Sequence, residues 1–148
     1  MNPGEVRAWL EANLPRAWFD AGRTGGPAAV REVRTRAEYE KWYPVFAASG
    51  LVVPTWPVAY GGLDVSVAAA REIENELRPF NLGRLNPLGL NNTAPALFSY
   101  GTEEQRLRFL PPMVRNEAFA LELSSRSEDF REGLTAFREK RDPRFEGR

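Results

Sequence analysis

The feature that most limits the fold of this chain is a stretch rich in proline, glycine and aromatic residues, at positions 51–64, between two segments with helical periodicity. It contains these residues: Pro54, Trp56, Pro57, Tyr60, Gly61 and Gly62. Proline fixes φ and lacks a backbone N–H, so no helix can run through the stretch. The glycine pair permits a tight turn, and the two rings each carry a polar tip that needs a partner if buried. The pattern predicts an ordered corner between two helices, and a ligand-contacting loop is the alternative.

Apolar residues at helical spacing predict helices at residues 3–14, 35–49, 67–78, 88–100 and 102–110. Their start signals are Asn2, Ser66 and two capping boxes, Thr35 with Glu38 and Thr102 with Gln105. Residues 15–34 show a mixed pattern in which Ala21–Pro27 reads as a flexible loop. Strand alternation does not persist, although 118–123 could begin a strand. We therefore predict an all-α helical bundle.

The predicted core consists of the large apolar residues on the inward faces of these helices and on the corner. They are Trp42, Phe46, Leu51, Ile73, Leu77, Leu97 and Leu107.

The composition excludes several classes of chemistry. The chain has no cysteine and no histidine, which removes thiolate nucleophiles, disulfides, the usual general base and the commonest metal ligands. Lys and Arg number 20 and Asp and Glu number 20, so no net charge attracts nucleic acid or an anionic membrane. No secretion signal or membrane-spanning run is visible, and we expect a cytoplasmic location.

Two separated blocks resemble the acyl-CoA dehydrogenase family. Gly50–Gly62 (GLVVPTWPVAYGG) is similar to a signature of the family's N-terminal helical domain, and Tyr100–Pro112 (YGTEEQRLRFLPP) is similar to a later element. The resemblance covers about residues 6–123, and it assigns 1–123 to an N-terminal-like helical domain. It implies FAD-dependent α,β-dehydrogenation of acyl-CoA thioesters.

The resemblance also implies where the acyl chain would lie. In the family a helix corresponding to 88–98 forms one wall of the acyl tunnel. The implied substrate contacts are Leu88, Leu90, Asn91, Ala94 and Leu97. The alternative is that these residues pack a helix pair. No glutamate stands in the family's catalytic context, and we assign no catalytic residue and no metal ligand.

The C-terminal residues 124–148 read differently. Residues 127–148 resemble the C-terminal tail of the enoyl-CoA hydratase/isomerase (crotonase) family, with an amphipathic helix that ends before Pro143. That resemblance implies that Phe137 and Lys140 contact coenzyme A. The family's flavin motif does not follow Leu123, so we expect the β-domain and the second helical domain to be absent.

Three interpretations follow from this combination. The first is a truncated dehydrogenase-like protein that binds no FAD and is inactive as this chain alone. The second is a helical interaction module, or a heteromer subunit, that completes a flavin and acyl-CoA site with a partner or self-associates through exposed apolar helix faces. The third is a non-functional gene-fusion remnant.

Overall fold

The computed structural model describes residues 1–85, 89–115, 132, 135, 140, 141 and 144. Within these residues the chain is helical and contains no strand, as predicted. The elements are α1 (Pro3–Asn13), α2 (Arg16–Val33), α3 (Arg36–Ala48), η1 (Val58–Tyr60), α4 (Val67–Leu77), η2 (Arg78–Phe80), η3 (Gly89–Thr93), α5 (Ala94–Tyr100) and α6 (Glu103–Arg115).

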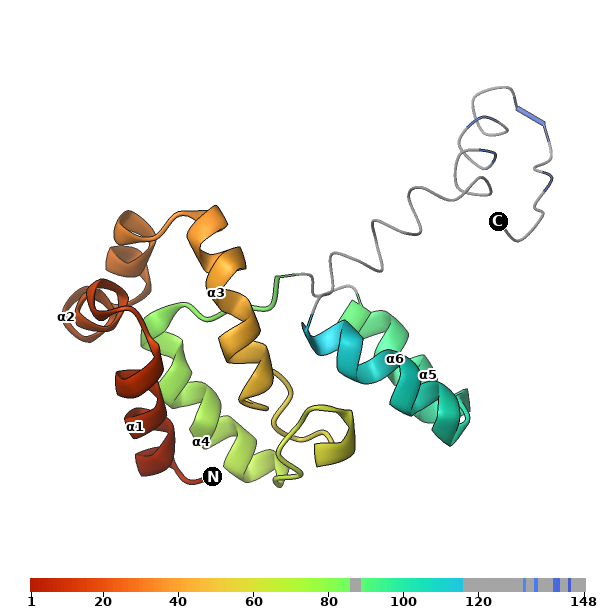
Figure 1. Ribbon diagram of the computed structural model, residues 1–148, viewed down its shortest axis with the longest axis horizontal. Coiled ribbons are helices and arrows are strands. Elements are labelled where there is room, and N and C mark those ends of the chain that lie inside the picture. Colours follow the sequence, from red (N-terminus) through yellow and green to blue (C-terminus); the bar gives the residue numbers. More distant parts are fainter. Residues whose placement is uncertain (86–88, 116–131, 133–134, 136–139, 142–143, 145–148) are drawn as a thin grey trace.

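The helices form one bundle around a shared apolar core. Helices α1 and α4 lie side by side, α5 and α6 form a pair at the other end, and α3 lies between them (Figure 1). The most deeply buried large side chains are Tyr43, Phe46, Leu10, Leu51, Ile73, Leu110, Val6, Val30 and Val114. Of the predicted core, Phe46, Leu51, Ile73 and Leu77 are buried, whereas Trp42 and Leu97 are partly buried against the core.

The predicted helix starts are confirmed by hydrogen bonds. The Asn2 and Thr35 side chains each accept from the backbone N–H three residues on, and a glutamate reaches back to complete both capping boxes. The Ser66 hydroxyl accepts from the Ala69 N–H at 3.2 Å. Thr102 and Gln105 form the third box. These bonds satisfy backbone donors that have no partner inside a helix, which fixes where each helix begins.

The expectation of a flexible loop at Ala21–Pro27 is wrong. Helix α2 runs through this region with one kink, at Gly26 (φ 64°, ψ −153°), after which Pro27 begins a second helical piece. The side chains of Trp18, Phe19 and Val30 are buried. The weak helix propensity of the glycines is overridden by this burial, because most helical stability in proteins comes from packing.

Two expectations about the last helix are also wrong. Helix α6 does not end before Pro111 but continues to Arg115, because Met113 and Val114 are buried beyond the proline pair. Leu107 is not a core residue, since 48% of its surface is exposed. The buried face of α6 instead passes through Leu110, one turn later.

The proline and glycine stretch forms the ordered corner that its composition predicts, and we call residues 51–64 the elbow. The Pro54 carbonyl accepts from the N–H groups of Leu63 and Val65, both at 3.2 Å. The Trp56 carbonyl accepts from the Asp64 N–H at 2.8 Å. These bonds fold the second half of the elbow back onto the first.

We expect Ile73→Ala to lower the free energy of unfolding by about 2–5 kcal/mol, because it leaves a cavity in the centre of the core. Val67, on the same helix, is 63% exposed, so Val67→Ala should change stability by about 0.5 kcal/mol or less. Urea denaturation of both variants checks the pair. Equal effects would contradict the core assignment.

We expect Gly22→Ala to destabilise the protein by about 1–3 kcal/mol. The same change in an exposed helix interior would stabilise by about 1 kcal/mol. The sign reverses because a Cβ at Gly22 would lie 2.4 Å from Cδ1 of Phe80. A double-mutant cycle with Phe80→Leu isolates this contact, and a coupling energy near zero would refute it.

Candidate functional site

The segment predicted to line an acyl chain consists of η3 and α5. Leu90 and Ala94 point into the core and are 5% and 0% exposed. Leu97 is partly buried, and Asn91 is exposed. Leu88 lies outside the described residues. Only Asn91 and Leu97 among the four described residues therefore offer more than marginal surface to a ligand.

The predicted helix at 88–100 does not begin as an α-helix. Gly89–Thr93 is π-helical, and the regular helix starts at Ala94 with Pro95 in its first turn. Proline lacks an N–H, so the carbonyls before it cannot all be paired in the ordinary α pattern. Single π-helical turns are frequent at functional sites, which draws attention to this segment.

The elbow holds α5 through aromatic contacts. The rings of Trp56 and Tyr60 meet the Phe98 ring edge-on, with centroids 5.0 and 5.7 Å away. The Tyr60 hydroxyl also donates to the Glu103 carboxylate at 2.7 Å, which ties the elbow to α6. Both elbow rings therefore pack against the bundle. This arrangement fits the interpretation of the elbow as a helix–helix corner.

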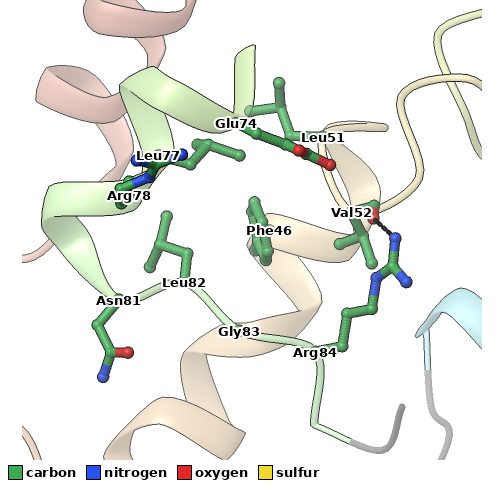
Figure 2. Close-up of a pocket in the computed structure, with 10 residues that line it drawn as sticks. All are labelled: Phe46, Leu51, Val52, Glu74, Leu77, Arg78, Asn81, Leu82, Gly83 and Arg84. Atoms are coloured by element: carbon green, nitrogen blue, oxygen red, sulfur yellow. Dashed lines mark hydrogen bonds between the residues drawn. The ribbon is translucent and has the colours of Figure 1, made fainter. Parts of the chain in front are cut away.

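A surface pocket of about 470 Å³, here called the hollow, opens between α3, the elbow, α4 and residues 81–84 (Figure 2). Its lining residues are Phe46, Leu51, Val52, Glu74, Leu77, Arg78, Asn81, Leu82, Gly83 and Arg84. The volume lies within the range of about 300–1,000 Å³ typical of small-molecule sites. None of the residues implied to contact the acyl chain lines it.

The outer edge of the hollow, residues 81–84, is held in place by two side chains from the N-terminal half. The Arg34 guanidinium donates to the Asn81 carbonyl at 2.9 Å. The Tyr39 hydroxyl donates to the Gly83 carbonyl at 2.6 Å. The guanidinium carbon of Arg34 lies 4.1 Å from the centroid of the Tyr39 ring, a distance that allows a cation–π interaction.

Arg84 connects the hollow with η3. Its guanidinium donates to the Val52 carbonyl at 3.3 Å and to Oδ1 of Asn91 at 2.9 Å. Sequence reasoning gave Arg84 no role and placed Asn91 with the substrate contacts. The sequence does contain a sign of such a role, because Arg84 is the single charged residue in the run from Phe80 to Thr102.

Among the described residues, no group of acidic side chains is arranged to hold a metal ion. The carboxylate in the hollow belongs to Glu74, and it has neither a histidine nor a cysteine to act with. Shape and charge are therefore what this surface offers to a ligand.

The two residues implied to contact coenzyme A belong to the C-terminal region. Phe137 lies outside the described residues. So does the possible strand at 118–123, and of the helix predicted between Ser127 and Pro143 the structure describes only residues 132, 135, 140 and 141. Lys140 is described: it has a left-handed backbone (φ 53°) and an exposed side chain.

Comparison with known proteins identifies relatives of the helical region. The family described as "Acyl-CoA dehydrogenase, N-terminal domain" matches residues 6–117. The acyl-CoA dehydrogenase IpdE1 of Mycolicibacterium smegmatis is 37% identical over 111 residues, which are 74% of this chain and 28% of that protein. IpdE1 of Mycobacterium tuberculosis is 33% identical over 108 residues, 72% of this chain and 28% of that protein.

A third relative covers a smaller share. The acyl-CoA dehydrogenase FadE34 of Mycobacterium tuberculosis is 36% identical over 98 residues, which are 66% of this chain and 14% of that protein. The chain thus spans less than a third of the curated relatives that it matches. No solved structure matches it.

The phenol of Tyr39 makes stability depend on alkaline pH. Burial raises its pKa above the ordinary value of about 10, against the opposing effect of the Arg34 guanidinium. The stability that this shift contributes is fully present below about pH 10 and is lost as pH rises towards the raised pKa. In an ultraviolet titration, Tyr39 should ionise only above the ordinary phenol range or on unfolding, because its pKa is raised. Tyr39→Phe should remove that late step.

Proposed function

The chain belongs to the acyl-CoA dehydrogenase family through its N-terminal domain, and from this premise we propose that it forms one wall of a site for FAD-dependent α,β-dehydrogenation of acyl-CoA thioesters. The observation that carries the proposal is the family match over residues 6–117, which includes the whole of the elbow, η3 and α5. The packing of the elbow rings on Phe98 supports it, because it keeps α5 in a fixed position relative to the bundle.

Within the wall, we assign the ligand contacts to Asn91 and Leu97. Leu97 is partly exposed and apolar, as a side chain that borders an acyl chain needs to be. Asn91 uses its Oδ1 to accept from Arg84, so its amide N–H₂ remains oriented by that bond. The buried Leu90 and Ala94 act as the support behind them.

The described residues by themselves do not fit FAD. A ligand site normally encloses most of its ligand, about 70–90% of the ligand surface. The hollow is 470 Å³ and ends at Glu74 on one side, and a flavin dinucleotide is larger than the drug-sized ligands for which such volumes suffice. We therefore derive no catalytic step from this chain's residues. In the family's reaction the flavin supplies the redox chemistry, and the helical domain supplies binding and orientation.

A second candidate function is a contact surface for the flavin-bearing part of the enzyme. Tyr100, Leu107 and Phe109, at the α5–α6 end of the bundle, are 90%, 48% and 44% exposed. Exposed apolar surface of this kind is covered when it belongs to a contact with another domain or chain. This candidate includes the case of a heteromer subunit, in which another chain carries the flavin.

Two further assignments remain proposals from the sequence. The resemblance of 127–148 to the crotonase tail supports contact of Phe137 and Lys140 with coenzyme A, and the exposed Lys140 side chain is compatible with that role. A cytoplasmic location follows from the sequence pattern. Within the part that the structure describes, no helix is long and apolar enough to cross a bilayer.

A chimera tests the proposed function. Residues 6–117 replace the matching N-terminal segment of the Mycolicibacterium smegmatis relative, and the product is assayed with that enzyme's own acyl-CoA substrate. We expect a folded, FAD-loaded protein with turnover, and we expect the unfused chain, mixed with FAD and then desalted, to retain no FAD and to show no turnover. A chimera that folds and binds FAD but turns over nothing would contradict the proposal.

Variants of the chimera test the wall. Leu97→Trp should lower kcat/KM by about tenfold or more, because hydrophobic pockets discriminate volume changes by about 1–3 kcal/mol. Val67→Trp, at a 63% exposed position on α4, is the matched control and should change it little. Equal effects of the two substitutions would remove Leu97 from the wall.

A further inference from the structure

We propose that the hollow between α3, the elbow, α4 and residues 81–84 is a binding site for an anionic amphiphile, an aliphatic chain that ends in a carboxylate or a phosphate. This site is separate from the wall formed by η3 and α5, because the two sets of lining residues do not overlap. The inference therefore does not depend on the proposed function.

The floor of the hollow is apolar and rigid. Phe46, Leu51 and Leu77 are 2%, 2% and 7% exposed and belong to the central core. Figure 2 shows the side chains of Leu77, Leu82 and Phe46 around the hollow. The three core side chains form the base of the hollow, and the partly buried Leu82 offers the apolar surface that an aliphatic chain can cover, because contact removes apolar surface of both partners from water. The floor offers no polar partner to a purely polar ligand.

The charge around the hollow favours an anion. Arg78 and Arg84 stand on opposite sides of the floor (Figure 2), and Glu74 is the acidic residue that lines it, which leaves a net charge of one positive unit. The Arg78 guanidinium, at the start of η2, donates to Oδ1 of Asn75 on α4 at 3.0 Å. A cationic or neutral head group would leave this excess charge unpaired.

Arg84 is the better placed of the two cations. Two acceptors from different elements, the Val52 carbonyl and Asn91, orient its guanidinium. A guanidinium carries five N–H groups, and these two bonds use two of them, so donors remain for an anionic head group. Arginine binds carboxylate and phosphate oxygens with paired hydrogen bonds, and orientation before binding reduces the entropy cost.

The outer edge of the hollow is also fixed before any ligand arrives. Arg34 and Tyr39 hold residues 81 and 83 by their carbonyls. The free chain therefore already has the shape that the ligand needs. A groove bordered by a loosely held loop would have to become ordered on binding, which costs free energy.

Decanoate is the probe, titrated into the full chain by calorimetry and by NMR of leucine methyl groups below its micelle concentration. We expect binding, with shifts at the methyls of Leu77 and Leu82 and none at Leu97 or Leu107. Decanol keeps the aliphatic chain but lacks the negative charge of the head group, and propionate keeps the carboxylate but lacks the long chain. Decyl phosphate shows whether the site prefers a phosphate or a carboxylate head group. Decanol should bind about tenfold more weakly than decanoate, because it cannot form a charged hydrogen bond with Arg84.

Three variants complete the test, each checked for an unchanged circular dichroism spectrum. Arg84→Gln should weaken decanoate binding about tenfold and leave decanol binding unchanged. Leu82→Trp should fill the hollow and abolish binding of both. Arg71→Gln, at an exposed position on α4 outside the hollow, is the matched control and should bind like the parent chain.

Binding of decanoate or of decyl phosphate that depends on Arg84 supports the proposal and identifies the head group. No binding of either, equal binding to Arg84→Gln, or methyl shifts at Leu97 in place of Leu82 would overturn it. These results are independent of the chimera, because neither turnover nor flavin is measured.

Discussion

The structure depends on the closure of the elbow onto its own carbonyl groups. The Pro54 carbonyl receives two backbone N–H groups and the Trp56 carbonyl receives a third, so the chain reverses within a few residues. This approach is possible because position 62 is glycine: a Cβ there would lie 2.1 Å from the Trp56 oxygen. Helix α3 enters the closed elbow, α4 leaves it, and α5 packs against its rings. A change that opened it would disturb all three helices.

A second set of interactions fixes the N-terminal half. Trp42 lies at the centre of an aromatic cluster, with ring centroids of Trp18 and Phe46 5.6 and 6.1 Å away, and its indole N–H donates to the Asn13 carbonyl. Arg34 extends the cluster by donating to carbonyls of the segment after α4. Because that segment forms the edge of the hollow, Arg34, which directly follows α2, shapes a surface that it does not line.

The wall and the hollow therefore belong to the same helical bundle but differ in the ligand that each would bind. The wall lies within the family match and begins with an irregular π-helical turn, and in the function that we propose its part is to limit the space of an acyl chain. The hollow has a rigid apolar floor and an oriented arginine, which suit retention of a ligand. Arg84 and Asn91 join them by one hydrogen bond. A ligand that binds Arg84 in the hollow would therefore be one hydrogen bond away from Asn91 at the start of the wall.

Local signals in the sequence determined much of the fold. Capping residues, proline positions and helical spacing determined the starts of α1, α3, α4 and α6, the corner at the elbow and most of the core, because each depends on residues close together in the chain.

Tertiary contacts decided the rest. Helix α2 continues past Gly22 and Gly25 and resumes after the kink at Gly26 because its aromatic residues are buried. Helix α6 passes two prolines because Met113 and Val114 reach the core. Leu107 faces outward because the buried face of α6 passes through Leu110, Met113 and Val114. The family motifs located the wall segment in the sequence, but which of its side chains reach the surface, and the existence of the hollow, depended on residues brought together from α3, α4 and two loops. No local pattern encodes such a meeting, since it results from packing between segments that are far apart in the chain.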